Sequence, residues 1–161
     1  MNVLAPVKSI MSTHLITVAP SDKLSLVKDI FDDHNIHHIP VVRYKELIGI
    51  ISKTDFMHFL QGFSPNEEDR FVNYARLRSY AAEEIMTKGL AKLSPDDRIN
   101  VALEIFLVNR FHAIPVVEND ELVGILTTYD IIKSLATEPV SPKQILENRQ
   151  HEGEVTEGIV G

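Results

Sequence analysis

Two short motifs in this 161-residue chain place a hydroxyl and a carboxylate three positions apart. They are Ser52-x-x-Asp55 and Thr127-x-x-Asp130, and each directly follows an apolar run. This spacing is typical of a capping arrangement, in which the hydroxyl satisfies free N–H groups at the start of a helix. A carboxylate at the end of a buried strand can also accept hydrogen bonds from both hydroxyls of a ribose, and the helix start favours a phosphate beside it. The two interpretations are compatible.

The two motifs belong to a longer repeat with a constant offset of 75 residues and no gap. Under this offset Met86 corresponds to Met11, His112 to His37, and Gly124 to Gly49. A fixed period without insertions indicates one supersecondary unit used twice. Two related units that pack together present related surfaces about a pseudo-twofold axis. We therefore expect the functional site in the cleft between them.

Each unit predicts the element order β-α-β-β-α, because short β-prone runs flank a segment with helical spacing of apolar residues. The fold class is therefore α+β, with a small sheet covered by two helices and the two units packed sheet to sheet. In the first unit we expect a strand at 15–18, a helix capped by Ser21 and Asp22, strands at 39–42 and 47–51, and a helix from Thr54. In the second unit we expect a strand at 90–93, a helix from Asp96 and Asp97, a hairpin turning at 118–121, and a helix from Thr128.

The predicted organisation is repeat 1 at 1–62, a linker helix at 63–81, repeat 2 at 82–137 and a polar tail at 138–161. The run Ser64-Pro65-Asn66-Glu67 is typical of a helix start, with a Ser cap and Pro at the first helical position. Phe71, Tyr74, Ala75 and Leu77 give this linker helix a modest apolar face. The end of the chain is expected to have little structure of its own.

Composition excludes several classes of function. The formal charge of −7 argues against nucleic-acid binding, which usually needs a basic face. The absence of cysteine removes a disulfide framework, a thiol catalyst and a Cys-based zinc site. No apolar run approaches the ~18 residues of a membrane span, and the N-terminus lacks the layout of a signal peptide. We expect a cytoplasmic protein without a membrane partner.

Other conspicuous residues have a simpler structural interpretation. His34, His37 and His38 could suggest a metal cluster, but His34 belongs to a helix and the other two enter a strand, so no metal site is expected. A glycine that interrupts an apolar strand, such as Gly49, usually marks a close backbone approach. A proline within a strand-like run, such as Pro40, indicates an edge or strand-start position. Lys53, Arg43, Arg76 and Arg78 are candidate phosphate partners, although exposed cations are more often plain solvated charge.

In combination these motifs resemble those of the CBS domain, named after cystathionine β-synthase, and two in tandem resemble the regulatory unit called a Bateman module. The resemblance covers roughly residues 7 to 137 and suggests a free-standing CBS-domain pair. It rests on Ile10-Met11 and Ile85-Met86, on His37-His38-Ile39-Pro40-Val41-Val42 and His112-Ala113-Ile114-Pro115-Val116-Val117, and on Gly49-Ile50-Ile51-Ser52-Lys53-Thr54-Asp55 and Gly124-Ile125-Leu126-Thr127-Thr128-Tyr129-Asp130.

The resemblance implies that adenine nucleotides or related adenosyl compounds bind in the clefts. In the family the matching Asp holds ribose, and the positions of Ser52, Thr54, Thr127 and Tyr129 reach ribose or phosphate. The units exchange residues: Asp130 is grouped with Thr13, Ile36, His37 and His38, and Asp55 with Lys88, Phe111, His112 and Ala113. His37 and His112 are expected near ligand phosphate, where a partly protonated imidazole can offset charge.

The leading hypothesis is a regulatory module that senses AMP, ADP, ATP or S-adenosylmethionine and requires no cofactor. Regulation requires that the ligand binds one conformation better than another. The resemblance also implies a homodimer formed through the flanking helices, and an unidentified protein target is compatible with it. The alternative is a structural or protein-interaction scaffold with empty or vestigial sites. An enzyme is not expected, because no nucleophile–base pair or phosphate-cradling Gly-rich loop is evident.

Overall fold

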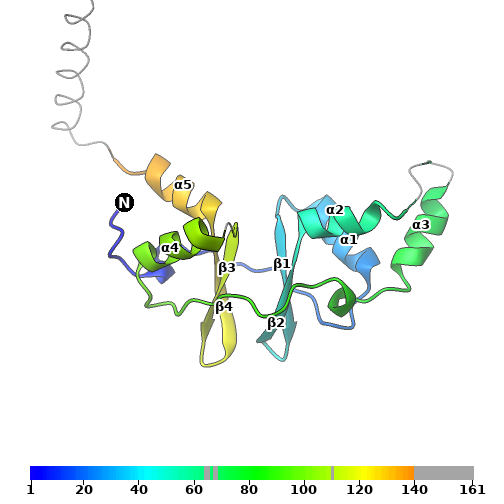
Figure 1. Cartoon of the computed structure of the whole chain (residues 1–161), viewed down its shortest axis with the longest axis horizontal. Helices are drawn as coiled ribbons and strands as arrows, with labels where there is room; N and C mark the ends of the chain where they lie inside the picture. The colour runs from blue at the N-terminus through cyan, green and yellow to red at the C-terminus, as the bar shows by residue number, and fades with distance from the viewer. Residues whose placement is uncertain (64–65, 67–68, 110, 140–161) are drawn as a thin grey trace, which may run out of the picture.

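The computed structural model describes residues 1–63, 66, 69–109 and 111–139, and these form two similar lobes (Figure 1). The lobes lie side by side, with their hairpins in the middle and their helices on the outside. The α+β class is confirmed. The first lobe contains α1 (Leu24–Asp33), β1 (His38–Arg43), β2 (Glu46–Ser52) and α2 (Lys53–Leu60), and the second contains α4 (Ile99–Asn109), β3 (Ala113–Glu118), β4 (Glu121–Thr127) and α5 (Thr128–Ala136).

The two predicted hairpins are confirmed. β1 pairs with β2 and β3 with β4, both antiparallel, and the sheet order β1-β2-β4-β3 places β1 and β3 at the edges. Both turns use two residues with positive φ, which is the conformation of the hairpin turns that match strand twist. The hairpins meet where Glu46 pairs with Glu121 and where Leu122 N donates to Lys45 O at 2.9 Å. Pro40 and Pro115 therefore lie in edge strands, as predicted.

The first strand predicted in each unit is not a strand. Residues 15–18 contribute only an isolated parallel bridge between Val18 and Val41, and residues 90–93 only the bridge between Leu93 and Val116. Val18 donates to Pro40 O at 3.1 Å and accepts from Val42 N at 2.9 Å. Two hydrogen bonds at one residue do not form a β-ladder. Val18 and Leu93 are nevertheless buried, as expected for residues of a core strand.

The predicted starts of the first helix in each unit are also wrong. α1 begins at Leu24 rather than after Ser21, because Asp22 accepts a hydrogen bond from Ala19 N at 2.7 Å and so closes a turn before the helix. In the second unit Asp97 does the same for Ser94 N at 2.7 Å, and α4 begins at Ile99. The acidic residues shape the approach to the helix and do not cap it.

The helix predicted between the repeats corresponds to α3 (Arg70–Leu77). Most of its predicted start at 64–67 lies outside the described residues, as does the tail from residue 140. Leu77 is buried in the first lobe, but Phe71 is 90% exposed, so only part of the predicted apolar face packs against the repeats.

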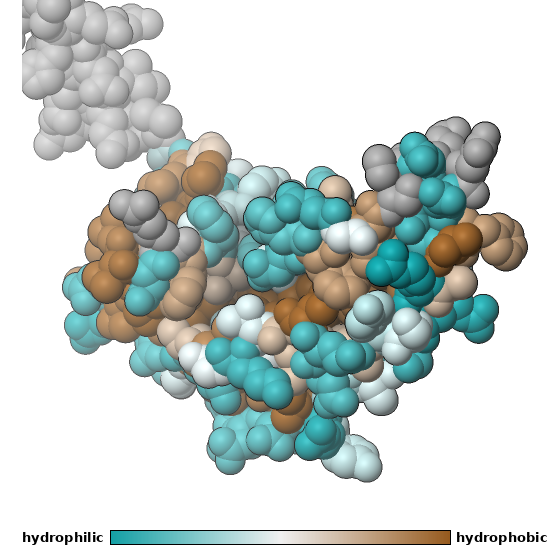
Figure 2. All heavy atoms as spheres, turned by 45° about the vertical axis from the view of Figure 1, so that its right-hand side comes forward, coloured by the Kyte–Doolittle hydropathy of each residue, from teal (hydrophilic) through white to brown (hydrophobic). Residues whose placement is uncertain are grey.

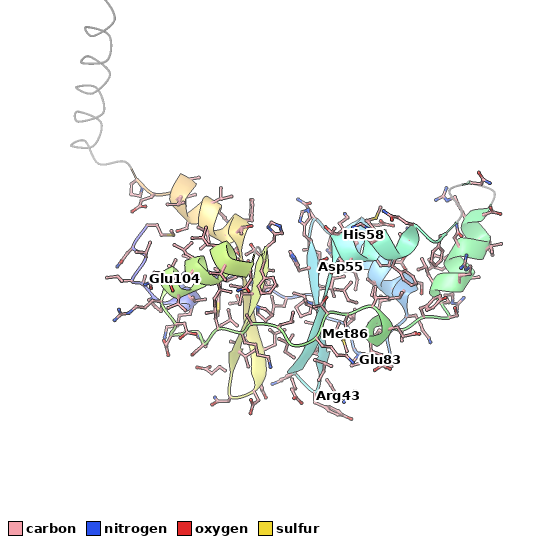
Figure 3. The ribbon with its side chains drawn as sticks, viewed as in Figure 1. Arg43, Asp55, His58, Glu83, Met86 and Glu104 are labelled. Carbon is pink, nitrogen blue, oxygen red and sulfur yellow. The ribbon has the colours of Figure 1, made fainter. Side chains whose placement is uncertain are left out.

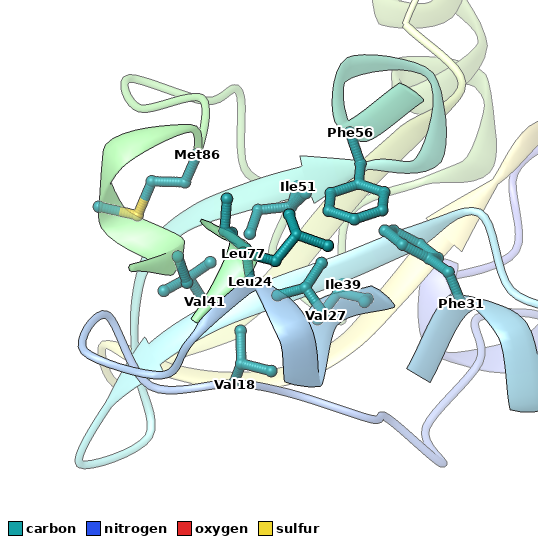
Figure 4. Packing of buried hydrophobic residues seen from close by; sticks show 11 residues of the cluster. Val18, Leu24, Val27, Phe31, Ile39, Val41, Ile51, Phe56, Leu77 and Met86 are labelled. Carbon is teal, nitrogen blue, oxygen red and sulfur yellow. The ribbon is translucent and has the colours of Figure 1, made fainter. Parts of the chain in front are cut away.

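Two segments, called crossing segments below, each pack into the core of the lobe that the other repeat forms. The N-terminal segment, which includes a 3₁₀ turn at Val7–Ser9, packs into the core of the second lobe, where Val7 N donates to Asp97 O at 2.7 Å. The linker turn at Ala82–Glu84 packs into the core of the first lobe, where Ala82 N donates to Asp22 O at 2.8 Å. Figure 4 shows Leu77 and Met86 within this first core. A sequence repeat is therefore not the same as a packing unit.

Gly49 and Gly124 allow this exchange, which confirms the interpretation of these glycines as points of close packing. A side chain at Gly49 would lie 2.7 Å from Met86 Sδ and 2.8 Å from Thr87 O, and one at Gly124 would lie 2.6 Å from Met11 Sδ. The methionine of each crossing segment therefore packs against the glycine of the lobe that the segment joins: Met86 against Gly49, and Met11 against Gly124. This contact brings the residue after each methionine to the sheet.

Candidate functional site

One cavity of about 1020 Å³ lies between the two repeats and is lined by residues from both. Asp55 and Asp130 both line it, at the N-terminal ends of α2 and α5. Figure 3 shows Asp55 at the start of α2. The volume is that of a site for a small molecule. The expected cleft is therefore present and is not filled by side chains.

The structure brings together all of the predicted site residues except two. Ile36, His37, His38, Ser52, Thr54, Asp55, Phe111, His112, Ala113, Thr127, Tyr129 and Asp130 line the cavity. Thr13 and Lys88 do not. Ser12 and His14, on either side of Thr13, line it instead, because neighbouring side chains of an extended segment point to opposite sides. Binding of a nucleotide by these residues remains a prediction.

Several lining residues were not predicted. Ser12 and Thr87 reach the cavity because their backbones form isolated antiparallel bridges with Ile125 and Ile50. The signal was present in the sequence, since a hydroxyl residue follows Met11 and Met86 at repeat-related positions. The other lining residues outside the prediction are His14, Leu15, Ile16, Asn35, Pro40, Ile50, Leu90, Ala91, Ile125, Thr128 and Lys133.

The two cap motifs are not equivalent. Asp130 is 8% exposed and completes a full capping box, because its Oδ2 accepts from Thr127 N at 2.8 Å and from Thr127 Oγ1 at 2.6 Å. Its Oδ1 accepts from Ser12 Oγ at 3.0 Å. Asp55 is exposed, and its carboxylate accepts from Ser52 Oγ at 2.6 Å. Ser52 and Thr127 cap their helices through their hydroxyls, and only Asp130 adds a carboxylate cap, so Asp55 faces the cavity with most of its acceptor capacity free.

The electrostatics of the cavity centre are set by histidines from both repeats. The pKa of His38 is lowered from 6.5 to about 4, mainly by burial and also by the neighbouring His37 and His112, while Asp55 opposes the shift. His38 is therefore neutral near pH 7. A neutral imidazole offers one hydrogen-bond donor and one acceptor to a base or a sugar but no charge to a phosphate.

Cations at the cavity are few. Among the described residues that line it, Lys133 is the one lysine or arginine. Arg43, Arg76 and Arg78, considered as phosphate partners, do not line the cavity, and neither does Lys53. Lys53 Nζ donates to Phe31 O at 3.3 Å, and Arg76 stacks over the Phe63 ring at 4.5 Å.

In the described part of the chain, no three His, Asp or Glu side chains come together in a way that could hold a metal ion. No described helix combines the length and the apolar character needed to cross a membrane.

Fold and site define a tandem repeat module with a small-molecule cavity at the junction of its two halves. The CBS domain family model matches residues 7–62 and 82–137. The chain belongs to the CBS domain family, as a tandem pair. The family resemblance inferred from the motifs is confirmed.

Known proteins with similar sequence are mostly longer. The protein MJ1225 of Methanocaldococcus jannaschii is 29% identical over 123 residues, which cover 76% of this chain and 44% of MJ1225. An inosine-5′-monophosphate dehydrogenase from Korarchaeum cryptofilum is 26% identical over 125 residues, covering 77% of this chain and 23% of that enzyme. The chain thus spans less than half the length of these curated relatives.

Solved structures of CBS-domain pairs share the fold. The CBS domain pair of protein MJ0100, in complex with 5′-methylthioadenosine and S-adenosyl-L-methionine, is 25% identical, has a TM-score of 0.67, and covers 83% of this chain and 97% of that one. CBSX2 from Arabidopsis thaliana, in complex with AMP, is 20% identical with a TM-score of 0.67, covering 82% and 96%. Both of these CBS-domain pairs were solved with adenosyl compounds bound.

Proposed function

We propose that this chain is a regulatory module that binds an adenosyl compound in the cavity between its repeats. The observation that carries the proposal is the cavity of about 1020 Å³, which both cap carboxylates line. Carboxylates at helix starts suit the hydroxyls of a ribose, and apolar residues such as Ile36 and Phe111 suit an adenine. The adenosyl ligands of MJ0100 support this assignment of ligand class.

A role in binding rather than catalysis follows from how the polar groups are used. The hydroxyls of Ser52 and Thr127 are engaged with the acids of their own caps, at 2.6 Å each. A hydroxyl that caps a helix is not positioned as a nucleophile beside a base. We therefore propose that the ligand is retained and sensed, and that it is not converted.

Thermal unfolding in the presence of ligands tests the proposal. A ligand at 100 times its dissociation constant stabilises the folded state by roughly 2.7 kcal/mol. For a domain of this size that corresponds to an increase in Tm of roughly 5–10 °C. AMP, ADP, ATP and S-adenosylmethionine should be compared, with guanosine and inorganic phosphate as controls. If none of the adenosyl compounds raises Tm, the sensor proposal fails and the scaffold alternative is favoured.

We further propose that two copies of the chain associate through the helices of the second lobe. Leu107 and Val108 on α4 are 81% and 80% exposed, and Ile132 and Leu135 on α5 are also exposed. Figure 2 shows hydrophobic side chains gathered over this side of the molecule. The residues of α1 that correspond to Leu107 and Val108 are Asp32 and Asp33, so the fold itself does not require apolar side chains there.

Sedimentation equilibrium tests this association. The unaltered chain should be dimeric at micromolar concentration, and Leu107→Asp, which copies the residue of the first repeat, should produce monomers. Asp32→Asn on the first lobe is the control and should leave the dimer intact. A monomeric unaltered chain would refute the association but not the ligand site.

A further inference from the structure

The repeat-related acids Asp55 and Asp130 differ in the number of acceptor positions they leave free. An ionised carboxylate has about four lone-pair positions. Asp130 uses three of these, two for Thr127 and one for Ser12. Asp55 uses one, for Ser52, and no described residue donates a hydrogen bond to its Oδ1. Two acceptor positions make up the difference: at Asp130 one accepts from the Thr127 amide within the motif and the other accepts from Ser12 outside it.

The backbone of Ser12 is held along β4 in a position from which its hydroxyl reaches Asp130. Its amide donates to Ile125 O at 2.9 Å and its carbonyl accepts from Ile125 N at 3.0 Å, so the crossing segment is held along β4. Its hydroxyl then reaches Asp130 Oδ1 at 3.0 Å. Met11, directly before it, lies against Gly124, which fixes how closely the segment approaches the sheet.

The corresponding residue of the other crossing segment does not make this contact. Thr87 forms the same two backbone hydrogen bonds with Ile50, at 2.9 and 3.0 Å. In the described part of the chain, however, no hydrogen bond joins the Thr87 hydroxyl to Asp55, which accepts from Ser52 alone. The bond from Ser12 to Asp130 therefore breaks the pseudo-symmetry of the cavity.

We propose that Ser12 closes the Asp130 half of the cavity, so that one chain binds one adenosyl ligand with its ribose on Asp55. This inference rests on the proposed function, because it assumes that a ribose is the group recognised. A ribose presents two adjacent hydroxyls, which are bound best when each carboxylate oxygen has a free acceptor position. Asp55 provides this arrangement without any rearrangement.

Binding at Asp130 requires a rearrangement first. Its Oδ2 is occupied by the two donors of Thr127, and its Oδ1 shares its remaining capacity with Ser12. A ligand must therefore displace the Ser12 hydroxyl from a charged group, and hydrogen bonds to charged groups are the stronger kind. Ser12 thus acts as a specificity-determining residue that decides how many ligands the cavity accepts.

Isothermal titration calorimetry of the whole chain with S-adenosylmethionine, 5′-methylthioadenosine and AMP tests the inference. The unaltered chain should bind one ligand. Ser12→Ala should bind two, with affinity at the second site increased on the order of ten-fold or more by removal of the competing hydroxyl. Ser12→Thr keeps a hydroxyl and should return to one ligand. Ser9→Ala is a control outside the cavity, because the Ser9 hydroxyl donates to Pro6 O at 2.6 Å, and it should also bind one.

A second pair of variants shows which acid is used. Asp55→Asn should weaken binding on the order of ten-fold or more, and adding Ser12→Ala to it should restore binding through Asp130. Two ligands on the unaltered chain, or an unchanged number after Ser12→Ala, would overturn this inference and leave the proposed function standing. No binding by any variant would refute both.

Discussion

Gly49→Ala and Gly124→Ala place the same methyl group at repeat-related positions, yet we expect them to differ in cost. At Gly49 the new carbon would lie 2.8 Å from Thr87 O, a backbone atom, as well as 2.7 Å from Met86 Sδ. At Gly124 the three nearest atoms all belong to the side chain of Met11, at 2.6–3.1 Å. A methionine side chain has three rotatable bonds and can move aside, whereas a paired backbone carbonyl cannot.

The magnitudes follow from these contacts. The Thr87 carbonyl and amide form two hydrogen bonds with Ile50, and moving them risks about 1 kcal/mol for each. Overpacking adds about 1–3 kcal/mol. We therefore expect Gly49→Ala to destabilise the protein by about 3–5 kcal/mol. For Gly124→Ala we expect about 0.5–1.5 kcal/mol, because Met11 can adjust and alanine restricts the unfolded chain.

Urea unfolding measures both values from the midpoints at constant slope. Gly62→Ala is the matched control, since its nearest contact would be an ordinary 3.7 Å and its effect should stay within about 0.5 kcal/mol. Equal costs for the two substitutions, or a larger cost at Gly124, would refute the reasoning that the backbone of the crossing segment is the fixed element.

Three other outcomes are expected. Because the pKa of His38 is lowered from 6.5 to about 4 in the folded state, the unfolded chain takes up its proton first as pH falls below 6.5. Stability should therefore decrease by roughly 1–2 kcal/mol between pH 7.5 and 5, after allowance for partial exposure, and His38→Gln should reduce this loss in urea unfolding. Thr127→Ala should destabilise by about 1–2 kcal/mol, because the buried Asp130 carboxylate loses a donor that water does not replace. Ser52→Ala should cost only about 0.5–1 kcal/mol, because water can replace the lost donor at the exposed Asp55; similar thermal-unfolding losses would contradict this. Hydrogen exchange should be slower at the amide of Asp130 than at that of Asp55, and the reverse order would show that the buried cap is the weaker one.

The hairpins and their helices could be predicted because their signals are local. The apolar runs of β1 and β2 are separated by a short polar turn, and Ser52 and Thr127 mark the starts of α2 and α5 within one turn of the chain. The predicted strands at 15–18 and 90–93 failed for a related reason. A β-prone run indicates that a residue such as Val18 is buried. Whether the run forms a strand depends on how many of its residues lie next to a partner strand, and Val18 forms only one isolated bridge.

The sequence by itself determined that the chain is a duplicated α+β unit, because a constant offset of 75 residues carries the same short-range pattern twice, and it identified 12 of the 25 residues that line the cavity. Only the tertiary structure decided which segments complete each lobe, since the N-terminal segment crosses to the second core and the linker to the first. It also decided that Asp130 is buried and Asp55 is open. One of the contacts that distinguish them comes from Ser12, which is 118 positions from Asp130 in the chain, and a contact over such a separation does not follow from local sequence.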